Sequence, residues 1–132
     1  MINHLLILIL LFLGCSSNCI SQILSENQEI TYLSGNKTSI KKEKDRMLYI
    51  FADARPHYII INSEPFGSYQ KKFDMYNQGI NSDGNKIYYC KDSDTGLQVN
   101  FVIHEDVVVP YLEKISIKNG KVSKITRYYY ED

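Results

Sequence analysis

Turn signals break this sequence at short intervals, and no segment sustains a convincing amphipathic helix. Clusters of Gly, Asn, Asp, Ser and Pro stand at 35–36, 53–56, 62–65, 81–85 and 92–96. The stretches between them are short and rich in β-branched and aromatic residues, which is typical of strands. Short connections favour antiparallel neighbours. The sequence therefore predicts an all-β antiparallel meander of about eight short strands, either closed into a small lipocalin-like barrel or folded into a two-layer sandwich.

The individual strands follow from alternation between the turns. Leu97 to His104 alternates most regularly, which predicts a half-buried strand with one wet face. Segment 68–77 fits either a strand or one or two helical turns, and we favour the strand. The expected strands cover 37–41, 47–52, 57–62, 68–77, 87–91, 97–104, 113–118 and 121–130, with 30–34 as a ninth candidate and 107–109 as a candidate beginning of the next strand.

Asn119-Gly120 predicts a two-residue type I′ hairpin turn, because both residues tolerate positive φ. Such a turn pairs Ile117 with Val122 across the two strands. Continued without a break, the same register sets Ile115 against Lys124. Ile125 suits that inner place better, so we expect a β-bulge near Ser123 to Lys124.

The first residues resemble a secretory signal. A short polar start is followed by the apolar run Leu5 to Leu13 and then by small residues. Nine apolar residues span only about 14 Å as a helix, too short for roughly 30 Å of hydrocarbon. We expect 1–21 to be a signal peptide cut after Ser21, 22–29 a flexible lead-in, and 30–132 a single β domain. The expected location is extracytoplasmic, either periplasmic or secreted.

A second reading of the same region is a lipoprotein signal. The segment Leu11 to Cys15 resembles a bacterial lipobox, with Phe12 where Leu is usual. Cys15 would then carry the lipid, and the protein would be an outer-membrane lipoprotein anchored to the membrane only by that lipid. An uncleaved anchor is the third alternative.

Charge and cysteine content limit the possible functions. Fifteen basic and fifteen acidic residues balance, so there is no excess of positive charge for nucleic-acid phosphates, and nucleic acid is not an expected partner. Cutting after Ser21 leaves Cys90 alone, which excludes an internal disulfide. Because Cys90 lies in a β-like run, we expect it to be a buried small hydrophobe.

Tyrosine is the unusual residue of this chain, with eleven copies and no tryptophan. Outward rings suit recognition of a protein or glycan, whereas inward rings suit a ligand cavity in a barrel mouth. The preferred hypothesis is a non-enzymatic, cofactor-free binding protein of the cell envelope, whose partner is a protein, a glycan or a small ligand. Its candidate binding residues are Tyr88, Gln98, Asn100, His104, Tyr128 and Tyr130.

The alternative is a small extracytoplasmic hydrolase or metal-dependent enzyme. It would use His57 and His104 with the nearby carboxylates Asp53 and Asp106, and it requires the two histidines to meet in a concave site. No complete metal motif supports this reading. The triplet Asp94-Thr95-Gly96 matches aspartic proteases in letters, but a hairpin turn explains it equally well.

Two segments carry a resemblance to small exported β-rich proteins of Bacteroidota-type bacteria. They are the signal end Cys19-Ile20-Ser21-Gln22 and the run Ile87 to Asp92, which is followed by a turn and Leu97 to Ile103. The resemblance covers roughly a third of the chain and rests on no specific motif. It implies export from a Gram-negative cell and an all-β fold, and it implies no catalytic residue.

Overall fold

The computed structural model describes residues 20–34, 37–41, 46–52, 57–62 and 70–131. Ten strands and no helix make up this part of the chain. The all-β prediction is confirmed, and the strand count exceeds the expected one because the N-terminal segment contributes a strand. The strands are β1 (Ile20–Ser25), β2 (Asn27–Ser34), β3 (Lys37–Lys41), β4 (Arg46–Phe51), β5 (Tyr58–Asn62), β6 (Gln70–Ile80), β7 (Lys86–Asp92), β8 (Gln98–His104), β9 (Tyr111–Lys118) and β10 (Lys121–Tyr129).

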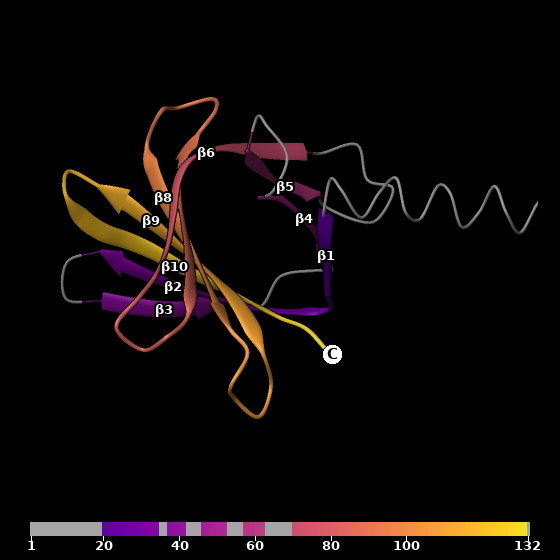
Figure 1. Cartoon of the computed structure of the whole chain (residues 1–132). Helices are drawn as coiled ribbons and strands as arrows, with labels where there is room; N and C mark the ends of the chain where they lie inside the picture. The colour runs from indigo at the N-terminus through magenta and orange to yellow at the C-terminus, as the bar shows by residue number, and fades with distance from the viewer. Residues whose placement is uncertain (1–19, 35–36, 42–45, 53–56, 63–69, 132) are drawn as a thin grey trace, which may run out of the picture.

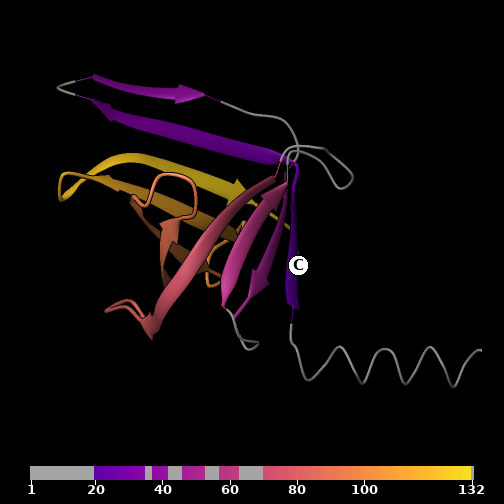
Figure 2. The same ribbon diagram turned by 90° about the horizontal axis from the view of Figure 1, so that it is seen from above.

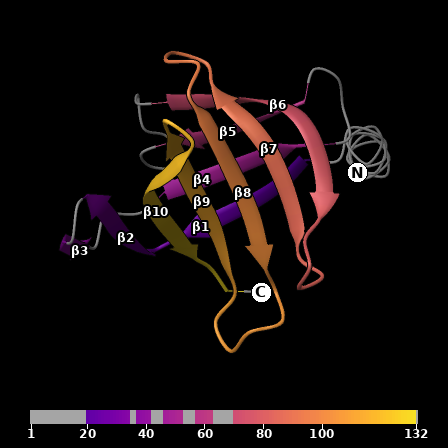
Figure 3. The same ribbon diagram turned by 90° about the vertical axis from the view of Figure 1, so that its left-hand side faces the viewer.

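All ten strands belong to one antiparallel sheet, in the order β1-β4-β5-β6-β7-β8-β9-β10-β2-β3. From β4 to β10 each strand pairs with the next along the chain, which is the expected meander. The sheet curls into a nearly closed barrel (Figure 1). In Figure 3, β1, β4 and β5 cross behind β6 to β9, so the two sides of the curled sheet face one another. One curled sheet replaces the alternative of two separate layers.

The N-terminal segment joins the two ends of this sheet. β1 pairs with β4, while β2, which begins two residues after β1 ends, pairs with β10. The chain turns a corner at Glu26, and Figure 2 shows the two strands leaving that corner in different directions. We expected residues 22–29 to be a flexible lead-in. The structure corrects this expectation, because these residues belong to β1, the corner and β2. Ile23, Ser25 and Gln28 of this segment are buried.

The hairpin of β9 and β10 confirms the local prediction closely. Asn119 and Gly120 have φ of 53° and 74°, and Ile117 pairs with Val122. A register shift between Val122 and Lys124 then brings Ile125 opposite Ile115. The expected bulge is present, but the face is the reverse of the expected one. Ile125 lies outside, because its neighbours Lys124 and Thr126 line the interior.

The segment before β9 corrects a second expectation. Val107 to Val109 do not begin a strand but form part of an exposed loop, in which Val108 is fully exposed. Pro110 follows as a buried residue, and β9 begins only at Tyr111. An apolar run of three residues is thus a poor predictor of a strand here, since alternation resumes only beyond Pro110.

The core occupies the barrel interior. The inward-pointing residues of β4 to β9 include the fully buried Leu48, Ile59, Phe73, Phe101 and Leu112. Phe73 and Phe101 meet edge to face, with 5.2 Å between their ring centroids. Apolar rings and branched side chains from opposite sides of the barrel thus pack into one continuous cluster.

Candidate functional site

A concavity lies inside one end of the barrel. It has a volume of about 630 Å³ and is lined by inward residues of β2 and of β4 to β10. Thr95 and Leu97 of the turn between β7 and β8 also reach it, which places it at the end of the barrel that carries this turn. Ligand cavities commonly fall in this size range and occur in the mouths of β-barrels.

Apolar and cationic side chains line this cavity together. Ile61, Phe73 and Val99 form its apolar part and continue into the core beneath. The cationic side chains are Arg46, Lys71, Lys114, Lys118 and Lys124, whereas Asp92 is the one carboxylate among the described residues of the lining. The whole chain has no net charge. The barrel mouth therefore concentrates positive charge that is balanced elsewhere in the molecule.

Among these cations, Lys114 lies next to buried core residues in the strand register. It is on the inner face of β9 between the positions of Leu112 and Ser116, and it pairs with the fully buried Phe101 across β8. Its Nζ lies 5.5 Å from the centroid of the Phe73 ring. Burial is the main reason why the pKa of Lys114 is lowered to about 8. Repulsion from Lys124, Lys71 and Arg46 lowers the pKa further, and attraction to Asp92 opposes this only in part. The structure shows no hydrogen bond or ion pair between Lys114 and another described residue.

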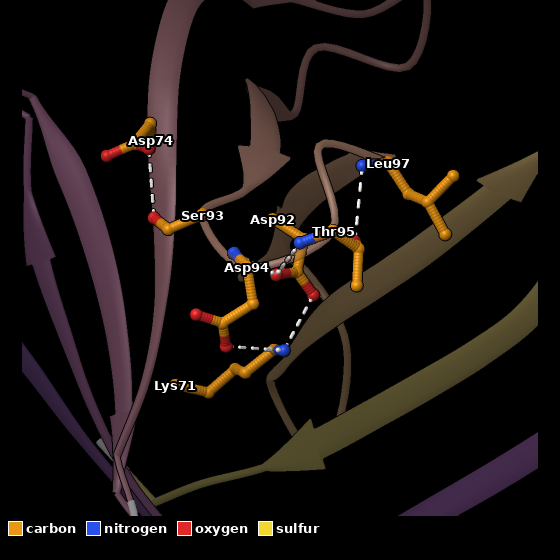
Figure 4. A network of polar contacts seen from close by, with 7 residues as sticks. All are labelled: Lys71, Asp74, Asp92, Ser93, Asp94, Thr95 and Leu97. Carbon is orange, nitrogen blue, oxygen red and sulfur yellow. Dashed lines mark hydrogen bonds and ion pairs between the residues drawn. The ribbon is translucent and has the colours of Figure 1, made fainter.

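Lys71, in contrast, has carboxylate partners. Its Nζ lies 2.9 Å from Asp92 Oδ2 and 3.1 Å from Asp94 Oδ2 (Figure 4). The Asp92 hydrogen bond is the main reason why the pKa of Lys71 is raised. These pairs largely neutralise Lys71, whereas the structure shows no ion pair between Lys114 or Lys124 and a described carboxylate.

The turn that carries these carboxylates is built around Asp92. Its Oδ1 accepts hydrogen bonds from the backbone N–H groups of Asp94 and Thr95, at 2.8 and 3.2 Å. Thr95 Oγ1 accepts another from the Leu97 N–H, and Ser93 Oγ donates to Asp74 Oδ2 (Figure 4). Asp94-Thr95-Gly96 is thus a hairpin turn, and its carboxylate binds a lysine.

Gln28 lies at the cavity wall next to the corner between β1 and β2. Its Nε2 donates to Ser25 O and Ser25 Oγ, at 2.8 and 3.0 Å. The side chain is buried, and Oε1 has no hydrogen-bond partner among the described residues. An unpaired buried acceptor is costly, so the corner between β1 and β2 has an unsatisfied polar atom among the described residues.

The six residues predicted as one binding surface are divided between two faces of the sheet. Tyr88 and Tyr128 are buried inside the barrel, and Tyr130 packs against the core. Of these three, Tyr128 lines the cavity. Gln98, Asn100 and His104 share the opposite, outer face by their alternation with Val99 and Phe101, although Gln98 reaches the cavity rim.

His104 is held within an outer polar cluster. Its ring stacks on Tyr111 at 4.3 Å, its Nε2 lies 3.6 Å from Glu113 Oε1, and its Nδ1 lies 3.4 Å from Asn85 Nδ2. Arg127 Nε contacts the other oxygen of Glu113 at 3.2 Å. These contacts give His104 a structural environment on the outside of the barrel, away from the cavity.

The structure does not bring the two histidines together. His57 directly precedes β5 and His104 ends β8, so β6 and β7 lie between them. Three strand spacings correspond to about 14 Å along the sheet. Asp106 lies in the exposed loop, and Asp53 is outside the described residues. Within the described chain, no group of three or more His, Cys, Asp or Glu could hold a metal ion.

Cys90 is fully buried, as expected. Burial raises the pKa of its thiol to about 12, and the charge of Asp74 adds to this effect. The thiolate is therefore absent near neutral pH, and Cys90 acts as a core residue.

The pattern of the sequence did not identify the cavity lysines. The signal was present in their spacing: Lys114 alternates with buried Leu112, and Lys124 alternates with Thr126 and buried Tyr128. Because apolar side chains usually occupy the inner face, the pattern predicts Ile115 and Ile125 there. The lysines next to them are then predicted on the outer face.

Comparison with known proteins finds no matching family model, curated protein or solved structure. In the part of the chain that the structure describes, no helix is long and apolar enough to cross a membrane. The barrel and its cavity are therefore the features from which function is inferred.

Proposed function

We propose that this chain is an exported, non-enzymatic binding protein that holds a small ligand in the mouth of its barrel. The observation that carries the proposal is the cavity of about 630 Å³, to which inward side chains of eight strands contribute. Its mixture of an apolar base with a few polar groups is the usual composition of a small-molecule site.

Export is the second part of the proposal and rests on residues 1–21, which have the pattern of a secretory signal. Cleavage after Ser21 would remove Ile20 and Ser21 from β1 and leave four of its six paired positions, Gln22 to Ser25. Lipidation at Cys15 would leave β1 whole and tie the barrel to a membrane surface. The mass of the N-terminal peptide from exported protein distinguishes the two forms.

Native mass spectrometry tests the binding function. Protein purified from the cell envelope without denaturant should carry an additional small-molecule mass, which is lost on unfolding. Ser116→Trp should remove this mass by filling the cavity, because Ser116 lines it. Asn100→Trp places the same ring on the outer face of the adjacent strand and should retain it. A bare chain in every preparation, or equal retention by the two variants, would contradict the proposal.

A further inference from the structure

We infer that the ligand of the barrel cavity is an amphipathic organic anion, whose acidic group binds Lys114 and Lys124 and whose apolar body packs on Phe73 and Val99. The inference rests on the proposed binding function and adds the chemical class of the ligand. Three features of the cavity support it: its charge balance, the placement of its cations, and the apolar surface beside them.

The charge balance selects an anion. Four lysines line the cavity, and Asp92 is the one carboxylate among the described lining residues. Asp94 adds a second negative charge at the rim through Lys71. Since both carboxylates bind Lys71, neither is available to pair with the remaining lysines in this arrangement. A cationic ligand would be repelled by Lys114 and Lys124, whereas an anion would relieve the repulsion between them.

The placement of Lys114 and Lys124 defines where the anionic group sits. Lys114 pairs with Thr126, which is two residues from Lys124 on the same inner face of β10. The two lysines are therefore diagonal neighbours inside the barrel. Lys124 Nζ lies 5.9 Å from the Tyr32 ring, on the β2 side of the cavity. A carboxylate, sulfonate or phosphate between the two ammonium groups would gain hydrogen bonds from both.

The apolar part of the cavity selects an amphipathic molecule over a simple inorganic ion. Phe73 and Val99 are 1 % and 5 % exposed, and both line the cavity and belong to the core. Phe73 lies 5.5 Å from Lys114 Nζ, so apolar surface begins directly below the cation. A ligand that places its acid on Lys114 would extend its hydrocarbon over these two side chains.

Two fluorescent probes that differ by one anionic group test this inference. Anilinonaphthalene sulfonate carries the sulfonate, and phenylnaphthylamine is the same skeleton without it. Both are titrated into the purified protein and into Lys114→Met, Lys124→Met and Lys121→Met. Lys121 is exposed in the β9–β10 hairpin and does not line the cavity, so it controls for surface charge. Methionine keeps the length of the lysine side chain and removes its charge.

We expect the sulfonate probe to bind at least about 10-fold more tightly than the neutral probe. Lys114→Met and Lys124→Met should each weaken sulfonate binding about 10-fold or more and change neutral binding by less than about 2-fold. Lys121→Met should change neither. Equal affinities for the two probes, with no effect of the cavity lysines, would overturn the inference and leave the binding function intact. Absence of binding by both probes would overturn the inference and the binding function together.

Discussion

Lys114 makes a prediction at the scale of one residue. Its pKa is about 8 in the folded protein and 10.5 in an ordinary environment. Between these values the unfolded chain binds a proton that the folded chain has released, so the free energy of unfolding rises with pH across this window. The full shift corresponds to roughly 3 kcal/mol, and screening at the open cavity reduces the expected gain to about 1–2 kcal/mol.

Urea unfolding at a series of pH values measures this gain. The free energy of unfolding of Lys114→Met should exceed that of the unchanged protein most at pH 7. This excess should decline as the pH rises beyond 8. Lys121→Met provides the control, because Lys121 is exposed. A difference that stays constant from pH 7 to pH 10 would show that Lys114 is not held in an unfavourable charged state.

At the scale of an element, the turn between β7 and β8 depends on Asp92 more than on Asp94. Asp92 accepts two backbone hydrogen bonds and pairs with Lys71, and its side chain is 12 % exposed. Asp94 makes the other Lys71 contact with a side chain that is 74 % exposed. We expect Asp92→Ala to lower the free energy of unfolding by about 2 kcal/mol and Asp94→Ala by less than about 0.5 kcal/mol.

The same turn has a pH dependence in acid, where stability again rises with pH. Burial raises the pKa of Asp92, but hydrogen bonds from Lys71, Asp94 N–H and Thr95 N–H outweigh it, so the pKa lies below the ordinary 3.8. The stabilising effect of Asp92 is therefore complete above pH 3.8 and is lost as the pH falls through the lower folded value. Urea titrations of Asp92→Ala in acid should approach those of the unchanged protein, and equal losses from both alanine variants would contradict this account.

The β9–β10 hairpin makes the second prediction about an element. Gly120 has φ of 74°, a region in which a side chain is strained, and an added Cβ would meet no atom within 4 Å. Gly120→Ala should therefore cost about 1–2 kcal/mol through backbone strain alone. Lys121→Ala serves as the matched exposed control. Chemical denaturation measures both, and an unchanged stability of Gly120→Ala would argue against the type I′ turn.

Elements whose signals are local were predicted best. Asn119-Gly120 and the bulge after Val122 depend on residues within one hairpin, and both are confirmed. β1 was missed because its neighbouring residues are polar, and it gains its stability from pairing with β4, which lies far along the chain. Val107 to Val109 were assigned to a strand from composition alone, although no neighbouring strand pairs with them.

At the scale of the whole molecule, the all-β meander follows from the spacing of turns, whereas the cavity does not. Whether an inward position holds core or cavity depends on which strands face each other across the barrel, and that arrangement depends on the corner at Glu26. From the sequence alone, every lysine in a strand is also expected to face solvent, because buried lysines are rare. Lys114 and Lys124 violate this rule at the candidate functional site, where such violations are expected.

We propose that the barrel interior, and not its outer face, binds a small molecule. Amide NMR spectra recorded while anilinonaphthalene sulfonate is added distinguish the two faces. We expect the largest shifts on cavity residues such as Phe73, Val99, Lys114 and Thr126. Shifts confined to the outer cluster around His104 and Tyr111, or to the exposed loop at Val108, would contradict it.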